Sequence, residues 1–173
     1  MTPARRLHSL ALAILLAVPA GAFAQESKSA ALATQLTQLL DAQKLDTIAA
    51  RSADQYVGAI YIAGAELLVV SGKIAAADRE NLLLSQKSYR DVYQDLFSAA
   101  DAKSKVFVTD LGANGLAFKN STPDTVEVAG KTVSFDGDWS KAKLSEQEYT
   151  KRYEASDEQY SQMLQALITA LKK

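Results

Sequence analysis

Residues 55–70 read QYVGAIYIAGAELLVV and decide the fold class of this chain. Residues 56–62 are rich in β-branched and aromatic side chains, and residues 66–70 are apolar on both faces of an extended strand. Between the two runs, Ala63, Gly64 and Ala65 suit a tight turn. Two such runs around a short glycine turn predict a β-hairpin that is buried on both sides.

Helical periodicity flanks this hairpin on both sides. Apolar residues at helical spacing predict helices over residues 27–43, 78–100 and 145–171. The last helix begins with a capping box, because Glu148 follows Ser145 by three residues. Its inner stripe is expected to pack on the sheet and consists of Tyr149, Tyr153, Ser156, Tyr160, Met163, Leu167 and Leu171.

More strands are predicted in the second half of the chain. Residues 105–111 alternate in polarity, and Asn114-Gly115 predicts a turn that returns the chain over residues 116–118. A further hairpin is predicted over residues 126–128 and 131–135, while residues 44–54 are expected to be a connector. Little helix separates the strand pairs, so the prediction is a single α+β domain over residues 25–173. Its sheet is expected to be mainly antiparallel, twisted or partly closed, and packed by about three helices that include a long C-terminal one.

The first 24 residues have the pattern of a signal peptide. Arg5 and Arg6 precede an apolar run over residues 10–18, and Ala22-Phe23-Ala24 forms a cleavage site before Gln25. The mature protein is therefore expected in the periplasm or outside the cell. The two arginines leave the twin-arginine route open beside general secretion.

Composition excludes several kinds of chemistry. The chain has no cysteine, and its one histidine, His8, lies within the predicted signal peptide. Thiol chemistry, disulfides, histidine-based triads and Cys/His metal sites are thus excluded for the mature chain. The formal net charge of −1 argues against a nucleic-acid partner. No apolar stretch after the signal peptide reaches the roughly 18–20 residues that cross a bilayer, so no transmembrane segment is expected.

Ser71-Gly72-Lys73 is a candidate anion site at the end of a predicted strand. A hydroxyl, a glycine amide and an ammonium group at one strand end could clamp a phosphate. The alternative is an ordinary strand exit with an exposed lysine, and this alternative is favoured on sequence grounds.

Two acidic patterns are further candidate sites. The segment Asp136-Gly137-Asp138-Trp139 resembles half of a calcium loop, but Lys141 and Gln147 stand where an EF-hand needs Gly and Glu. A polar turn with Trp139 packed on the core is the favoured alternative. A second acidic group consists of Asp91, Asp95, Asp101 and Asp110. Two of these carboxylates could form a general acid/base pair, but a solvated helix face is the favoured alternative.

Several segments resemble a family of small exported bacterial proteins of uncharacterised function. They read QYVGAIYI (55–62), LLVVS (67–71), YRDVY (89–93), KVFV (105–108) and FDGDW (135–139). The order of elements is also similar to that of FMN-binding split barrels of the pyridoxamine-phosphate-oxidase type. This second resemblance implies a split-barrel-like fold and an FMN cofactor, with Ser71 and Lys73 as the residues that would hold its phosphate.

These observations favour an exported domain that binds a small ligand or an envelope protein partner without catalysis. No catalytic residue, metal ligand or resident cofactor is expected in this interpretation, and a homodimer is one expected state. The alternative is an FMN-binding split barrel that could act as an oxidoreductase. A third hypothesis is a calcium-stabilised envelope protein that uses Asp136 and Asp138.

Overall fold

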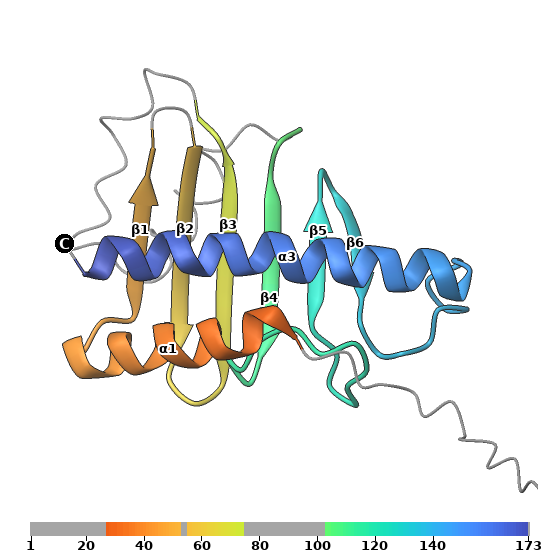
Figure 1. The fold of residues 1–173 in the computed structure, drawn as a ribbon, viewed down its shortest axis with the longest axis horizontal. Helices are drawn as coiled ribbons and strands as arrows, with labels where there is room; N and C mark the ends of the chain where they lie inside the picture. The colour runs from red at the N-terminus through yellow and green to blue at the C-terminus, as the bar shows by residue number, and fades with distance from the viewer. Residues whose placement is uncertain (1–26, 53–54, 75–102, 173) are drawn as a thin grey trace, which may run out of the picture.

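The computed structural model describes residues 27–52, 55–74 and 103–172. Within these ranges, two helices accompany a six-stranded antiparallel sheet in which every strand pairs with its neighbours in sequence (Figure 1). The elements are α1 (Lys28–Gln43), β1 (Thr47–Arg51), β2 (Gln55–Ile62), β3 (Glu66–Lys73), β4 (Val106–Leu111), β5 (Thr125–Val128), β6 (Lys131–Ser134) and α3 (Glu146–Leu171).

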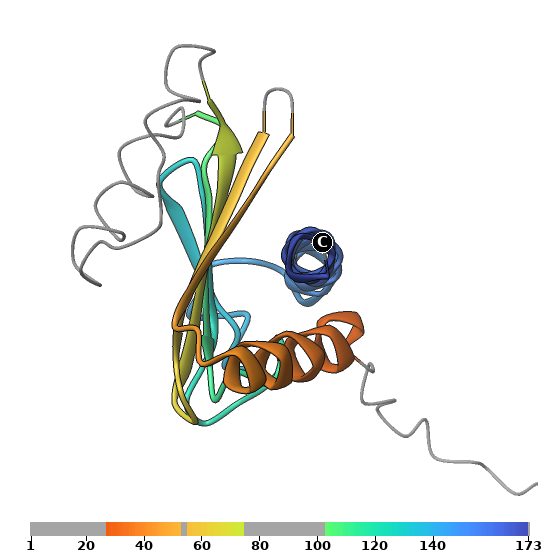
Figure 2. The same cartoon turned by 90° about the vertical axis from the view of Figure 1, so that its left-hand side faces the viewer.

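The predicted α+β class is confirmed, with an antiparallel sheet and a long C-terminal helix. The sheet is twisted and open, with β1 and β6 at its two edges (Figure 2). The helix predicted over residues 78–100 lies outside the described residues. Neither described helix is long and apolar enough to cross a membrane.

Both helices lie on the same face of the sheet, and α3 runs across all six strands (Figures 1 and 2). The main core fills the space between these layers. Leu36 and Leu40 of α1, Val69 of β3 and Tyr153 and Leu164 of α3 are all 0–1 % exposed in this core. Full burial of an aliphatic side chain contributes roughly 1.5–3 kcal/mol before entropy is subtracted, so this layer of side chains holds α3 to the sheet.

Four aromatic rings fix the first half of α3 above the β6 end of the sheet. Phe118 and Phe135 each meet Tyr149 and Tyr153 edge to face, with ring centroids 5.2–5.7 Å apart. Such pairs add about 0.5–1.5 kcal/mol each to the free energy gained by area burial. The tyrosine stripe predicted for this helix is therefore confirmed as core.

The opposite face of the sheet carries a second apolar cluster. Tyr56, Ile60, Val70 and Ile74 are 0–5 % exposed there. Because Val57, Ala59, Leu67 and Val69 are buried on the helix-covered face, β2 and β3 are buried on both faces. This confirms the hairpin predicted from residues 55–70.

Three local predictions were wrong. Residues 44–54 are not only a connector, because Thr47–Arg51 pairs along its whole length with β2. Residues 116–118 do not return as a strand, since β4 pairs with β5 instead. Trp139 does not pack on the core and is 42 % exposed. The predicted helix at residues 27–43, the β5–β6 hairpin and the capping box of α3 are confirmed.

Candidate functional site

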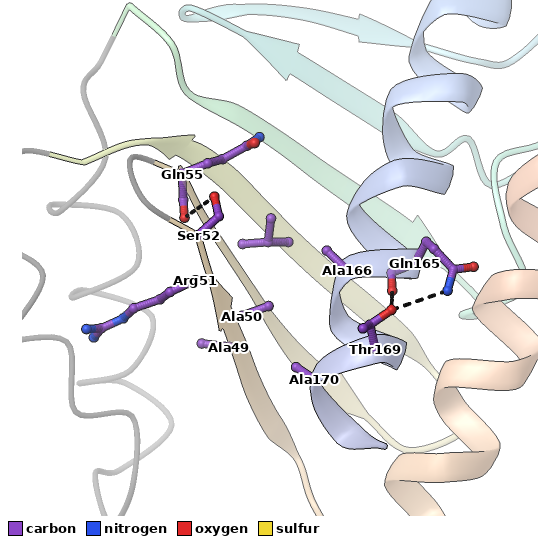
Figure 3. A pocket seen from close by; sticks show the side chains of 10 residues that line it. Ala49, Ala50, Arg51, Ser52, Gln55, Gln165, Ala166, Thr169 and Ala170 are labelled. Atoms are coloured by element: carbon purple, nitrogen blue, oxygen red, sulfur yellow. Dashed lines mark hydrogen bonds between the residues drawn. The ribbon is translucent and has the colours of Figure 1, made fainter. Parts of the chain in front are cut away.

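A cavity of about 430 Å³ opens between the β1–β2 edge of the sheet and the last turns of α3 (Figure 3). This volume lies within the roughly 300–1,000 Å³ that is usual for small-molecule sites. We call this cavity the β1–α3 notch. Its lining consists of Ala49, Ala50, Arg51, Ser52, Gln55, Val57, Gln165, Ala166, Thr169 and Ala170.

Small side chains create the floor of the notch. Ala50 and Val57 are paired across β1 and β2 on the face that the helices cover. Opposite them, Ala166 and Ala170 lie four residues apart on α3, and therefore on one side of the helix. Alanine side chains end at Cβ, so the helix and the strands stay separated here by a space that longer side chains would fill.

The rim of the notch is polar, and Arg51 is its one charged residue. Gln165 and Thr169 come from α3, and the Thr169 hydroxyl donates to the Gln165 carbonyl oxygen at 2.8 Å. On the opposite side, the Ser52 backbone N–H donates to the Gln55 carbonyl oxygen at 2.9 Å. The side chain of Arg51 points away from α3 (Figure 3). A ligand group in the notch would thus meet an apolar floor bordered by hydroxyl and amide groups.

Two buried carboxylates, Asp110 and Asp124, lie at the loop after β4. Asp110 accepts hydrogen bonds from the backbone N–H groups of Asn114 (3.1 Å) and Gly115 (2.8 Å) and from the Tyr160 hydroxyl (2.9 Å). Asp124 accepts from the backbone N–H groups of Leu111 (2.9 Å) and Ala117 (3.0 Å).

Burial raises the pKa values of both carboxyl groups. Both side chains are 0 % exposed. Desolvation raises the pKa of Asp110 and raises the pKa of Asp124 to about 6, although the hydrogen bonds from backbone amides oppose both shifts. Desolvation and the nearby Asp110 charge also raise the pKa of Tyr160. Since their oxygens are occupied by the protein's own donors, the two carboxylates hold the loop in place and do not face a ligand.

This network explains why the hairpin predicted at Asn114-Gly115 does not form. The amides of Asn114, Gly115 and Ala117 bond to carboxylate oxygens, so they are unavailable to a strand ladder. Asp110 was a candidate general acid or base in the sequence, and the structure instead gives it this structural role. The other candidates of that group, Asp91, Asp95 and Asp101, lie outside the described residues.

A third buried carboxylate joins the two helices. Asp157 of α3 is 4 % exposed and accepts from the backbone N–H groups of Lys28 (2.7 Å) and Ser29 (3.1 Å) at the start of α1. It also accepts from the hydroxyls of Ser27 (2.9 Å) and Ser29 (2.6 Å). The Ser29 hydroxyl in turn accepts from the backbone N–H of Leu116 at 2.9 Å, so the same contact fixes the loop after β4.

The predicted anion residues lie at the end of β3. Ser71 is 3 % exposed and pairs with Val57 and Val106, whereas Lys73 is exposed and its backbone N–H donates to the Ser104 hydroxyl at 2.8 Å. Neither residue lines the β1–α3 notch. A role for the two in binding a phosphate stays a prediction.

The acidic turn before α3 is closed by a lysine. The Lys141 ammonium group lies 3.1 Å from Asp136 and 3.7 Å from Asp138. Hydrogen bonds from the Asp138 amide and from Lys141 lower the pKa of Asp136, and bonds from Ser140 and the Lys141 amide lower the pKa of Asp138. Among the described residues there is no group of three or more Asp, Glu, His or Cys side chains that could hold a metal ion.

The sequence predicted no site at the notch, because its four alanines and its polar side chains form no recognised motif. Comparison with other proteins adds no assignment of the site. No protein-family model, curated protein or solved structure matches this chain.

Proposed function

We propose that this protein is an exported, non-catalytic binding domain and that the β1–α3 notch receives an uncharged group of its ligand. The observation that carries the proposal is the pairing of an apolar floor, formed by Ala50, Val57, Ala166 and Ala170, with a rim of hydroxyl and amide groups from which the side chain of Arg51 points away (Figure 3). Export is supported by the signal-peptide pattern of residues 1–24.

The chemistry of the lining selects against charged groups and against catalysis. A charged group on the alanine and valine floor would lose hydration there, and the one ionised side chain of the lining, Arg51, points away from α3 (Figure 3). Hydroxyl and amide groups of a ligand, in contrast, can exchange hydrogen bonds with Ser52, Gln165 and Thr169. The lining has no carboxylate, imidazole, thiol or amine that could act as a general base or nucleophile.

Ala166→Phe tests the site by filling the notch from α3. Purified mature protein would be titrated with uncharged amides, polyols and short neutral peptides while its amide NMR signals are recorded. For a subset of these compounds, we expect the amide signals of notch residues to shift. Ala166→Phe should bind these compounds with an affinity weaker by about tenfold or more. Ala155→Phe is the matched control, because Ala155 is exposed on the same helix beside β5 and β6 and outside the notch.

Two results would contradict the proposal. Equal affinities of Ala166→Phe and the wild type would show that the ligand binds elsewhere. Chemical turnover of a bound compound would show that the domain is an enzyme. Export has its own measurement, since the N-terminal residue of the secreted form should be Gln25.

FMN binding is the alternative function. It depends on Lys73, which is exposed at the end of β3, and on Ser71, whose side chain is buried beside it. Fluorescence titration with FMN distinguishes the two functions. Quenching that is lost in Lys73→Ala and kept in Ala166→Phe would favour the flavin, whereas unchanged FMN fluorescence would reject it.

A further inference from the structure

The β1 edge of the sheet presents the backbone groups of Thr47 and Ala49, which bond no described residue. The Tyr61 N–H donates to the Asp46 carbonyl oxygen, and the Ser52 N–H donates to the Gln55 carbonyl oxygen. In an antiparallel ladder, hydrogen-bonded and non-hydrogen-bonded pairs alternate. The register of β1 on β2 therefore turns the N–H and C=O groups of Ile48 and Ala50 toward β2, and those of Thr47 and Ala49 away from the sheet.

The notch reaches this open edge. Ala50, and Ser52 just after β1, lie on the helix-covered face, whereas Ala49 and Arg51 lie on the other face, and all four line the same cavity. The cavity therefore passes around the β1 backbone to its outer side. A strand laid along β1 would lie about 4.8 Å from it. Every second side chain of that strand would point to the helix-covered face, beside Ala50 and below the last turns of α3.

The opposite edge of the sheet differs in two ways. At β6 the Ser134 carbonyl oxygen already accepts a hydrogen bond from the Tyr149 hydroxyl at 3.3 Å. The hollow next to this edge is bordered by the cationic side chains of Lys131 and Arg152. Short edge strands and charged side chains hinder strand pairing. β1 also ends in a cation, Arg51, which points away from α3 (Figure 3), but the small side chains of Ala49 and Ala50 precede it, so another backbone can approach closely there.

We infer that the ligand is an extended segment of another polypeptide that adds as a further strand to β1 and places one uncharged side chain in the notch. This inference rests on the function proposed above and names the chemical class of the ligand. Main-chain hydrogen bonds with Thr47 and Ala49 would supply affinity that is independent of sequence. The notch would supply the preference for a neutral side chain, which is the usual division of roles in strand addition.

Ala49→Pro tests the edge without breaking the sheet. Proline at this position removes the outward N–H of Ala49, while the ladder bonds of Ile48 and Ala50 to β2 remain. Thr132→Pro is the matched control at the β6 edge. The bonded pairs of β5 with β6 include Asp124 with Phe135, so the Thr132 N–H also points outward. Both variants would first be checked by circular dichroism and urea denaturation.

The probes are blocked peptides about six residues long, the usual length of a strand. They alternate threonine with valine, leucine, serine or asparagine, and each has a twin that is N-methylated at alternate residues. We expect the unmethylated peptides to slow hydrogen exchange of the Thr47 and Ala49 amides of the wild type by at least about tenfold. N-methylation removes the N–H groups from one edge of the peptide. The N-methylated twins should therefore not slow this hydrogen exchange when that edge faces β1. Ala49→Pro should weaken binding by about tenfold or more, whereas Thr132→Pro should not.

The outcomes separate this inference from the function on which it rests. If binding is insensitive to N-methylation and to Ala49→Pro but is lost in Ala166→Phe, the notch binds a ligand and strand addition is wrong. If Ala166→Phe changes nothing, the proposed function is also wrong. If Ala49→Pro converts a wild-type dimer into a monomer in light scattering, the occupant of the edge is a second copy of this chain, and the inferred foreign segment is rejected. If Ala49→Pro does not fold, the N-methylated peptides on wild-type protein decide alone.

Discussion

Replacing Asp157 with alanine should destabilise the whole domain through α1. Ser27 is the N-cap of α1, but its side chain makes no capping hydrogen bond, and the first turn of α1 contains no acidic residue. Asp157 of α3 supplies both missing functions, because its carboxylate accepts from the Lys28 and Ser29 amides. The helix is therefore capped by a residue of a different helix.

The size of the effect follows from the bonds that are lost. An N-cap interaction is worth about 1 kcal/mol, and a negative charge at the helix N-terminus adds about 0.5 kcal/mol. The Ser29 amide and hydroxyl are buried, and leaving such donors unsatisfied costs about 1–3 kcal/mol. The free energy of unfolding should thus fall by about 3 kcal/mol. Asp157→Asn keeps one acceptor oxygen and should lose roughly half as much.

Urea denaturation followed by circular dichroism measures this loss. Glu158→Ala is the matched control, because Glu158 is the next residue of α3 and pairs with Lys28 at 2.7 Å on the exposed surface. Exposed pairs of this kind contribute little to stability. Similar denaturation midpoints for Asp157→Ala and Glu158→Ala would refute the argument that a buried carboxylate caps α1 from α3.

Three further predictions concern the loop after β4. The folded pKa of Asp124 is about 6, above its unfolded value of 3.8. The folded state therefore binds the proton more tightly, and the free energy of unfolding decreases as pH rises through 6. Urea denaturation should show about 1 kcal/mol more stability at about pH 5 than at about pH 7.5, and this difference should shrink in Asp124→Asn. Gly115→Ala should lower the free energy of unfolding by about 3 kcal/mol in the same assay, because φ at Gly115 is +91° and a Cβ there would lie 2.5 Å from the α1 backbone. Gly130→Ala is the control and should cost only about 1 kcal/mol, because φ is +78° but no atom lies within 4 Å of the added Cβ. Tyr160→Phe should cost about 1–2 kcal/mol at neutral pH and raise the pKa of Asp110 further, measured by carboxyl NMR titration, because the buried carboxylate loses a donor.

The elements that the sequence predicted correctly are those with dense local information. The capping box at Ser145 and Glu148 marks the start of α3 to the residue. The β-branched and aromatic runs at residues 55–70 specify β2, β3 and their turn because both strands are buried on both faces. In each case the side chains that give the pattern also make the contacts.

The wrong predictions concern segments whose partners are distant in sequence. Thr47–Arg51 contains two alanines and has weak strand propensity, and it forms a strand because β2 offers it a complete ladder. Asn114-Gly115 is typical of a hairpin turn, but Asp110 and Asp124 take the amides that a hairpin would use. No local rule reveals that two aspartates fourteen positions apart will be buried around one loop.

The candidate site could not be predicted for a related reason. A notch formed by alanines is a consequence of side chains that are too short to fill a space, and the space exists only once α3 crosses β1. The sequence drew attention to charged and hydroxyl residues, since known chemistry uses them. Of these, the pair Asp136 and Asp138 holds Lys141, and Asp110 holds the backbone of a loop.

The contact between Asp157 and the start of α1 also governs the order in which the chain can fold. The Lys28 amide finds its acceptor 129 positions later in the sequence, so a nascent chain that stops before α3 lacks both the cap of its first helix and the helix that crosses all six strands. Stable structure must wait until the last helix has been synthesised. General secretion, one of the two export routes that the arginines of the predicted signal peptide leave open, threads a chain through the membrane before it folds and would benefit from that delay.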